Sequence, residues 1–353
     1  MIQSYNIFDD TKDSLPEGRA DFLLAGSVTK TCEIEGLTQA GIPGKIALTP
    51  TLDAELVNSG KVFSMPELAE TPKGVPTPAV ITRAVHNLDG FSQVAMLNLG
   101  LEVLPKEVKL FNFDIEPSDA INNNAKIDAK TIFAKGMEFG KKYELQGNYL
   151  ILAESTPSGT TTALASALAL GYNVANDFSS SFLHTPDSLK NKVVQEALAL
   201  TDDSMGKFEK LGVVSDNMLL FVAGFLVEAT RRFHVVVAGG TQMAAALLIA
   251  DALREDVLKR LKSENLTLAT TKWVAKDTNA NIKHILEQLS YKPHAIYREF
   301  SFANTEIPPL KMYDEGEAKE GVGAGAALAY AAKNGKDNQE LLEAIELVLY
   351  ELI

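Results

Sequence analysis

The feature that most constrains the fold is a repeated transition from an apolar, β-branched segment, through a turn of small residues, into a helical pattern. FHVVVAGG (residues 233–240) is followed in this way by a helical run rich in alanine and leucine, and YLILAES (149–155) by another. Continuously apolar strands that alternate with helices form a mainly parallel sheet covered on both faces. The sequence therefore predicts a doubly wound, Rossmann-like α/β fold, whose ligands bind at the carboxyl ends of the strands.

Other segments extend this alternation along the chain. Further strands are expected at residues 22–26, 45–50, 266–274 and 294–302. Residues 91–100 fit either a strand or a buried helix. Alanine and leucine dominate residues 163–170, which predicts a helix that ends at Gly171. The apolar run 218–227 is too short to span a bilayer and is expected to be a buried helix.

The length of 353 residues fits one large α/β domain with an accessory piece. We expect the main domain over residues 20–335 and a small accessory segment made of residues 1–19 and 336–353, helical at its C-terminal end. An N-cap pattern begins at Asp337. Apolar residues then recur at helical spacing: Leu341, Leu342, Ile345, Val348, Leu349 and Leu352. This stripe is expected to pack on an N-terminal helix or on a second subunit, and plain packing is favoured over a specific partner role.

The segment ELAETPKGVPTP (67–78) is expected to be a loop. Pro72, Pro76 and Pro78 interrupt it, and proline cannot donate to a regular hydrogen-bond ladder. Loops of this kind are either mobile or face a ligand.

The charge balance argues against several kinds of partner. The chain carries 33 basic and 46 acidic residues, a formal charge of −13, which disfavours nucleic acid or anionic lipid as the main partner. Its one cysteine, Cys32, cannot form a disulfide within the chain, which suits a reducing compartment. The N-terminal residues have neither a basic start nor an apolar core, so no signal peptide is expected. We therefore expect a soluble, cytoplasmic protein that does not act on a membrane.

The segment AESTPSGTTTA (153–163) is the first candidate for chemistry. A buried strand runs into a loop of glycine and hydroxyl residues and then into a helix, an arrangement that presents backbone N–H groups to a phosphate. The Gly-Lys-Ser/Thr ending of a Walker A loop is absent. A plain capped helix explains the pattern equally well. Glu154 favours a site, because a carboxylate at the tip of a buried strand needs water or a partner.

The segment EGVGAGAALAYAA (320–332) is the second candidate. Its glycines superficially resemble a dinucleotide fingerprint, but charged residues precede them and only helix follows, so the strands of that motif have no place. The glycines would let a ligand approach the backbone closely. Glu320, just before them, could take a proton from a substrate nitrogen. On residue type alone, an exposed loop acid is the more common case.

A third turn, at Gly239 and Gly240, ends one strand and opens a small-residue helix (235–253). This pattern fits a nucleotide site and equally a tight strand-to-helix turn. The candidate anion partners are Lys190, Lys192, Arg231 and Arg232, each a residue type that is more often a solvated surface charge. The five histidines show no paired metal-ligand spacing, and neither GxSxG nor CxxC occurs. Metal-dependent hydrolysis and serine-type acyl transfer are therefore not expected.

Taken in order, these segments resemble the nicotinate-nucleotide–dimethylbenzimidazole phosphoribosyltransferases, and more narrowly their archaeal and cyanobacterial branch. Residues 154–162 look like the family's strand-end glutamate and phosphate loop, and residues 320–323 look like its Glu-Gly-x-Gly. Residues 215–230 and 235–253 are similar to the segments that lie between. The likeness runs over most of the chain and rests on the ordered set rather than on any one motif.

The resemblance implies a site that needs no metal and no cofactor. Its catalytic residues would be Glu320, as the base, and Glu154. The residues implied to bind the nucleotide are Ser155, Thr156, Ser158, Gly159, Thr160, Thr161, Lys190 (with Lys192 as the fallback), Gly239, Gly240, Ser301, Gly321 and Gly323. The implied partners are nicotinate mononucleotide and a benzimidazole or purine base, bound by a homodimer.

The implied reaction moves the phosphoribosyl group of nicotinate mononucleotide to 5,6-dimethylbenzimidazole or a related base. Nicotinate and α-ribazole 5′-phosphate would be the products, the latter for the lower ligand of cobalamin. The N-terminal hundred residues match the bacterial branch of the family poorly, so the accepting base stays open.

Two alternatives follow from the residues themselves. An NAD(P)-dependent oxidoreductase would bind its cofactor at Gly239 and Gly240. Asp277 lies 37 residues after Gly240 (277 − 240), farther than the roughly 20 residues expected for a ribose-binding acid, which counts against this reading. A nucleotide-binding protein without catalysis would keep the same pocket and bind nicotinate mononucleotide without turnover.

Overall fold

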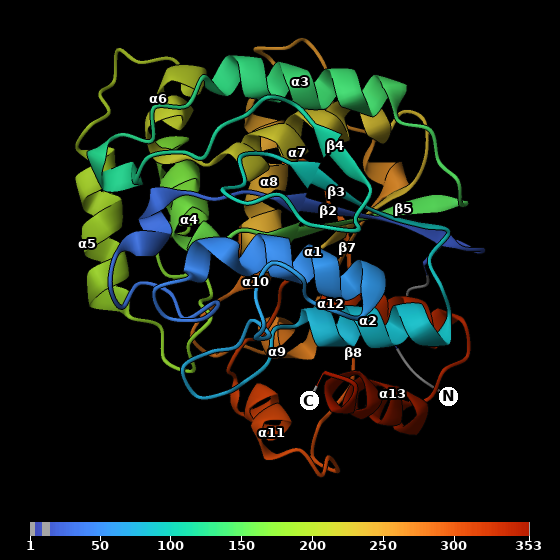
Figure 1. The fold of residues 1–353 in the computed structure, drawn as a ribbon. Helices are drawn as coiled ribbons and strands as arrows, with labels where there is room; N and C mark the ends of the chain where they lie inside the picture. Colours follow the sequence, from blue (N-terminus) through green and yellow to red (C-terminus); the bar gives the residue numbers. More distant parts are fainter. Residues whose placement is uncertain (1–3, 9–14, 353) are drawn as a thin grey trace.

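An eight-stranded sheet forms the centre of the protein, seen in a computed structural model that describes residues 4–8 and 15–352 (Figure 1). The strand order is β1-β8-β7-β6-β5-β2-β3-β4, and every neighbouring pair is parallel except β1 with β8. The strands are β1 (Ser4–Asn6), β2 (Ala20–Gly26), β3 (Gln93–Asn98), β4 (Leu110–Asn112), β5 (Tyr149–Ser155), β6 (Val235–Ala238), β7 (Leu266–Thr271) and β8 (His294–Arg298). The predicted mainly parallel α/β fold is confirmed.

Helices cover both faces of this sheet, each over its own apolar core (Figure 1). One core is closed by α3 (Ala129–Lys142), α4 (Gly159–Ala169), α5 (Asp187–Leu198), α6 (Lys207–Val214), α7 (Asn217–Ala229), α8 (Thr241–Ala252) and α10 (Ile282–Glu287). The other is closed by α1 (Thr49–Ser59), α2 (Ala79–Leu88), α11 (Pro308–Glu315), α12 (Ala324–Lys333) and α13 (Asn338–Tyr350). Within the described residues, no helix is both long and apolar enough to cross a bilayer.

The chain reverses its direction across the sheet between β2 and β5. β2, β3 and β4 proceed toward one edge, after which β5 pairs with the other side of β2 and the later strands continue to the opposite edge. At such a switch point the loops after the two strands diverge and leave a crevice at their carboxyl ends. Glu154 lies opposite Ala25 in this strand pair, and Ser155 lies opposite Gly26. The fold therefore carries both residues to the crevice.

The local predictions hold for most strands and fail where a helix begins. The ambiguous segment 91–100 contains β3, and the predicted strands 266–274 and 294–302 end early, at Thr271 and Arg298. The single turn α9 (Lys272–Ala275) follows β7 directly. The strand predicted at 45–50 is wrong, because a 3₁₀ turn (Ile46–Leu48) leads there into α1. Pro50 sits in the first turn of α1, where a missing N–H costs nothing.

The two terminal segments attach to the main fold in different ways. β1 extends the sheet at its β8 edge. The predicted N-cap at Asp337 is present, because its carboxylate accepts the backbone N–H groups of Gln339 and Glu340 at the start of α13. The apolar stripe of α13 packs on α2, a helix of the main domain. Residues 1–3, 9–14 and 353 of the predicted accessory segment lie outside the described residues.

Candidate active site

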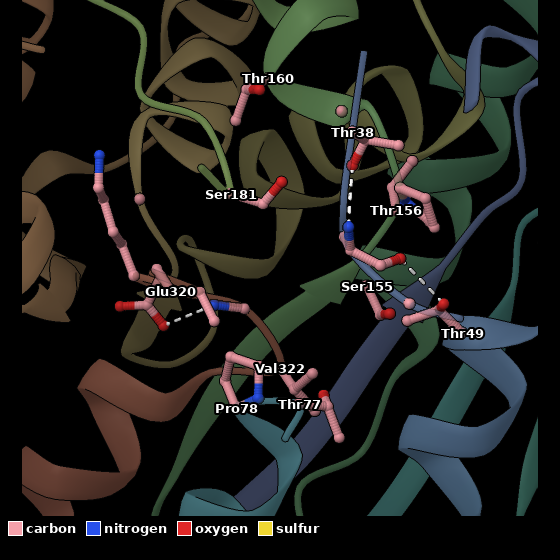
Figure 2. A pocket seen from close by; sticks show the side chains of 18 of the residues that line it. Thr38, Thr49, Thr77, Pro78, Ser155, Thr156, Thr160, Ser181, Glu320 and Val322 are labelled. Carbon is pink, nitrogen blue, oxygen red and sulfur yellow. Dashed lines mark hydrogen bonds between the residues drawn. The ribbon is translucent and has the colours of Figure 1, made fainter. Parts of the chain in front are cut away.

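A cavity opens at the switch point, over the carboxyl ends of the central strands. Its empty space measures about 990 Å³, part of which is open to solvent. Five loops supply most of its wall, and they come from residues 37–41, 69–78, 154–160, 179–181 and 318–322. The proline-containing loop 67–78 predicted from the sequence thus faces the cavity. In Figure 2, Glu320 lies on one side of this space, and Ser155 and Thr49 lie on the other.

The loop between β5 and α4 forms one wall as a compact, hydroxyl-rich turn. Ser158 adopts a left-handed backbone with a φ of 64°, and α4 starts at the next residue. Gly159 has no room for a side chain, because an added Cβ would lie 2.1 Å from Nε2 of Gln242, at the start of α8. Two helix N-termini therefore meet at this wall. Their aligned backbone N–H groups favour an anion.

Three polar side-chain atoms at this wall are buried and lack a hydrogen-bond partner among the described residues. They are Thr156 Oγ1, Ser158 Oγ and Gln242 Nε2, and all three residues line the cavity. Buried polar atoms are normally paired, since an unpaired one costs about 1–3 kcal/mol. Within the described part of the chain, two hydroxyls and one amide of this wall are therefore unpaired, which is uncommon for buried polar groups.

Glu320 lies in the loop before α12, and four donors surround its carboxylate. One oxygen accepts the backbone N–H of Thr271 (2.7 Å) and the Thr270 hydroxyl (3.2 Å), and the other accepts the backbone N–H groups of Gly321 (3.1 Å) and Gly325 (3.2 Å). Gly325 permits this contact because a Cβ there would lie 2.1 Å from the backbone of Thr270. The end of β7 and the start of α12 thus jointly fix the orientation of the carboxylate.

The two glutamates of the cavity hold their protons unusually strongly. Burial, together with the nearby charges of Glu320, Asp216 and Asp53, raises the pKa of Glu154 to about 8. Burial also raises the pKa of Glu320 to about 7, although its four hydrogen-bond donors act in the opposite direction. Desolvation therefore outweighs the helix N-terminus at Glu320. Near neutral pH, Glu320 is the more readily ionised of the two.

Two more buried carboxylates, Asp53 and Asp216, lie near these glutamates. They belong to helices that cover opposite faces of the sheet. Asp53 of α1 accepts the hydroxyl protons of Thr77 (2.6 Å) and Ser155 (2.7 Å), and burial raises its pKa to about 6. Asp216 caps α7 by accepting the backbone N–H of Leu219 (2.9 Å), and burial raises its pKa to about 6 as well. Their charges add to the field that keeps Glu154 protonated.

Lys319 carries the formal positive charge of the cavity wall, and no other lysine or arginine lines this cavity in the described part of the chain. Its side chain is 3% exposed and its ammonium group donates to Asp277 over 2.6 Å, a carboxylate that is also 3% exposed. Ser179 donates to the same carboxylate over 3.1 Å. The ion pair thus ties the loop before Glu320 to the loop 179–181.

The structure brings most of the sequence-predicted site residues to this cavity. The predicted residues that line it are Glu154, Ser155, Thr156, Ser158, Gly159, Thr160, Gly240, Glu320 and Gly321. Thr161, Gly239 and Gly323 lie directly beside lining residues without contributing to the wall themselves.

Lys190 and Ser301 lie elsewhere, each with partners of its own. Lys190 is buried behind the loop 179–181, where its ammonium group donates to the carbonyl oxygens of Phe178 (3.2 Å) and Ser179 (2.8 Å), and burial lowers its pKa to about 7. The fallback, Lys192, is exposed and faces Glu196. Ser301 is exposed and donates to Asp314 over 2.7 Å. None of these three side chains lines the cavity.

Sequence reasoning missed several residues of the site. Asp53, Thr77, Gln242 and Lys319 line the cavity, and Thr270 with Thr271 binds Glu320. Thr77 belongs to the proline-containing loop and Lys319 precedes Glu320, so their neighbourhood was a usable signal. Asp53 carries no such signal, because it lies in α1, a segment with no motif and no predicted element beyond residue 50. Among the described residues, no group of three or more His, Cys, Asp or Glu side chains is placed to hold a metal ion.

Comparison with known proteins gives relatives over nearly the whole chain. No protein-family model matches the sequence. The UPF0284 protein of Sulfurisphaera tokodaii is 34% identical over 347 residues, which cover 97% of this chain and 96% of that protein. The UPF0284 protein of Methanocaldococcus jannaschii is 36% identical over 311 residues, which cover 87% and 86%.

Two solved structures share the fold. The nicotinate-nucleotide–dimethylbenzimidazole phosphoribosyltransferase of Thermus thermophilus matches with a TM-score of 0.58 and 16% identity, over 94% of this chain and 83% of that one. CobT of the same organism matches with a TM-score of 0.58 and 17% identity, over 95% and 85%. At this level of identity the likeness shows the fold, which agrees with the fold implied by the sequence resemblance.

Proposed function

This chain belongs to the UPF0284 family, and on that premise we propose that it is a phosphoribosyltransferase of cobalamin synthesis. Its donor would be nicotinate mononucleotide and its acceptor 5,6-dimethylbenzimidazole or a related base. The products would be nicotinate and α-ribazole 5′-phosphate.

One observation carries this proposal. Glu154 and Glu320 meet at one cavity with raised pKa values, and the wall beside them is built from two helix N-termini and unpaired polar atoms. Titratable groups shifted by burial in a cavity are typical of catalytic sites. An anion site next to a base of pKa about 7 suits a phosphorylated donor together with an acceptor that must lose a proton.

The donor's phosphate would bind at the hydroxyl-rich wall. Ser158 and Thr160 line the cavity there, at the N-terminal end of α4, where the helix dipole favours an anion. Lys319 supplies a cation to the same cavity in place of the lysine that the sequence suggested. Asp277 already balances the charge of Lys319, so the phosphate would add to an ion pair rather than meet a free ammonium group.

The reaction would then need one proton acceptor and no leaving-group acid. The bond between the ribose C1′ and the pyridinium nitrogen breaks, and its electron pair neutralises the positive charge of the ring. One nitrogen of the azole forms the new bond to C1′ from the opposite face, so the configuration changes from β to α. The other nitrogen loses its proton, which Glu320 accepts. A positioned base of this kind contributes on the order of 10²–10⁴-fold.

Glu154 would act through its charge on the same centre. Positive charge develops at C1′ as the pyridinium leaves, and a nearby carboxylate stabilises it. With a pKa of about 8, Glu154 is largely protonated at pH 7 in the free protein. Binding of the cationic pyridinium ring would lower that pKa, since an opposite charge favours the ionised form.

The oxidoreductase alternative finds less support at this site. Gly240 lines the cavity, but Asp277 is engaged by Lys319 and Ser179, so its carboxylate is not available to a ribose. The binding-protein alternative differs only in turnover and is separated by experiment.

The test incubates the purified protein with nicotinate mononucleotide and 5,6-dimethylbenzimidazole and separates the products by chromatography. Free nicotinate and α-ribazole 5′-phosphate should appear together. A rise in melting temperature with nicotinate mononucleotide but no product would indicate a binding protein. A change at the absorbance band of reduced nicotinamide, with NAD(P) as the added ligand, would indicate an oxidoreductase. Either result would overturn the proposal.

A further inference from the structure

A buried carboxylate underlies the end of the cavity that faces α1 and α2. Asp53 is 1% exposed, lines the cavity, and has no ion-pair partner among the described residues. Both of its oxygens are occupied by hydroxyl donors, Thr77 on one side and Ser155 on the other. A buried anion without a cation forces its neighbours to act as donors.

This arrangement fixes which way the two hydroxyl groups point. A hydroxyl has one proton and two lone pairs, and here each proton is committed to Asp53. Ser155 Oγ has no donor among the described residues, so both of its lone pairs remain open. Thr77 Oγ1 accepts the backbone N–H of Ala79 at 3.3 Å and keeps one lone pair. Both residues therefore offer acceptors, and no donor, to a molecule in the cavity.

A third hydroxyl at this end is committed in the same way. Thr49 donates to the carbonyl oxygen of Ala40 over 3.1 Å, which leaves its lone pairs open. Thr38 differs, because it accepts the backbone N–H of Ala40 and keeps a proton that can turn toward a ligand. The hydroxyls of Ser155 and Thr77, which Asp53 orients, do not have this freedom.

Ser155 lies across the cavity from Glu320, and both Ser155 and Thr77 lie away from Thr160 at the start of α4 (Figure 2). Pro78, next to Thr77, contacts the Glu320 loop, since a Cβ on Gly321 would lie 3.7 Å from its Cγ. Figure 2 shows Thr77, Pro78 and Val322 together, with Thr160 at the opposite end of the cavity. Pro78 and Val322 give this end apolar surface for a flat ring. A base whose azole nitrogen reaches Glu320 would thus turn its distal ring toward Ser155 and Thr77.

We propose that the accepting base carries a hydrogen-bond donor, an O–H or an N–H, on the ring distant from its reacting nitrogens, and that Ser155 and Thr77 accept it. This inference rests on the proposed function and narrows its acceptor. A methyl group at the same place would bury the lone pairs of both hydroxyls without a partner. Sites built to bind a substrate O–H or N–H discriminate strongly against analogues that lack it.

The test compares two bases of matched size on the wild-type protein, 5-hydroxybenzimidazole and 5-methylbenzimidazole. With nicotinate mononucleotide as donor, kcat/KM should be at least about tenfold higher for the hydroxy base. 5-Methoxybenzimidazole, which has an oxygen but no proton, should behave like the methyl base. Equal values for the hydroxy and methyl bases, or a preference for the methyl base, would overturn the inference while leaving the transferase proposal intact.

Calorimetric titration with the same bases separates the inference from the proposed function, because binding needs no turnover. If no base is ribosylated, the transferase proposal fails, yet the hydroxy base should still bind at least about tenfold more tightly. Binding of neither base, or equal binding of both, would overturn the inference in that case also.

Variants at two buried aspartates identify the source of the preference. Asp53→Asn places an amide donor against one of the hydroxyls, whose proton then turns into the cavity, so the preference should fall at least about threefold. Asp216→Asn is the matched control. Asparagine also caps helices, and Asp216 contacts Thr162 and α7 rather than Ser155 or Thr77. In the Asp216→Asn protein, the ratio of kcat/KM for the hydroxy base to kcat/KM for the methyl base should stay at the wild-type value. An unchanged ratio in a folded Asp53→Asn protein would remove Asp53 from this role.

Discussion

The backbone N–H of Val322 donates to the carbonyl oxygen of Glu154 over 2.9 Å. This bond fastens the loop that carries Glu320 to the end of β5, so the two glutamates are positioned by one connection. Thr82 of α2 donates its hydroxyl proton to the carbonyl oxygen of Val322 over 2.7 Å and holds the loop from the other side. The pairing of the two acids is therefore built into the backbone and does not depend on a bound ligand.

Replacing Glu320 with glutamine should lower kcat by at least about 100-fold with little change in fold, because the amide cannot accept the azole proton. Steady-state kinetics measure the loss of kcat, and circular dichroism checks that the fold is unchanged. Glu315→Gln is the control, since Glu315 is exposed on α11 and lines no part of the cavity. A folded Glu320→Gln protein with turnover near wild type would remove Glu320 from the base role.

The pH profile of kcat/KM should report the ionisation of Glu320. The base must be an anion, and its pKa is about 7, so kcat/KM should rise as pH increases through 7 and level off above it. Glu154 has a pKa of about 8 and should extend the rise toward pH 8. A profile that is flat from pH 6 to pH 9, with an unchanged rate-limiting step, contradicts this assignment.

The free energy of unfolding should fall as pH rises, whereas kcat/KM should increase. The pKa of Glu154 is raised from 4.5 to about 8 in the folded protein, so its neutral form favours folding. That contribution is fully present below about pH 4.5 and is lost as pH rises through about 8. Glu154→Gln should therefore raise the melting temperature by about 3 °C or more at pH 9 and by much less at pH 5.

Thermal melts at the two pH values measure this difference. Glu144→Gln, at an exposed position before β5, provides the matched loss of one carboxylate and should leave the wild-type pH dependence unchanged. Equal stabilisation by Glu154→Gln at both pH values would mean that Glu154 is ionised in the folded protein throughout.

Gly159→Ala should weaken the nucleotide site. The added Cβ would displace the Gln242 side chain, which lies 2.1 Å from its position, and would intrude on the start of α4. We expect KM for nicotinate mononucleotide to rise at least about tenfold, a loss of about 1.4 kcal/mol. Gly206→Ala, before α6, meets only a Glu209 oxygen at 3.4 Å and should leave KM unchanged. Similar KM values for the two variants would exclude the α4 N-terminus from nucleotide binding.

Lys319→Met should destabilise the protein by about 3–5 kcal/mol, because it leaves Asp277 buried without its cation. The double variant Lys319→Met with Asp277→Asn removes both charges and should recover most of that loss in chemical denaturation. If Lys319 also binds the phosphate, the double variant should still bind nicotinate mononucleotide at least about tenfold more weakly. Recovery of both stability and affinity would leave Lys319 with a structural role alone.

The sequence was sufficient for the parts of the site that lie within single segments. The end of β5 with its hydroxyl-rich turn, and Glu320 with its glycines, were recognisable because strand, turn and helix follow one another without interruption. The parallel fold followed from the same alternation. These features depend on local pattern and on composition, which a single sequence contains.

The contributions from distant segments could not be predicted in this way. Asp53 binds Ser155, which lies 102 positions later in the chain, and no local pattern around Asp53 indicates this contact. The family resemblance places Lys190 in the nucleotide site, yet tertiary packing turns its ammonium group away from the cavity. Side-chain direction is set by packing, and periodicity does not report it.

The most direct test of the proposed transferase activity is a time course that measures nicotinate and ribosylated base in the same reaction. The two products should accumulate in equal amounts, neither should form when the base is omitted, and Glu320→Gln should slow both together. Release of nicotinate at the same rate without any base would contradict the proposed activity, since the protein would then be a hydrolase. Absence of both products with every benzimidazole and purine base tested would contradict it as well.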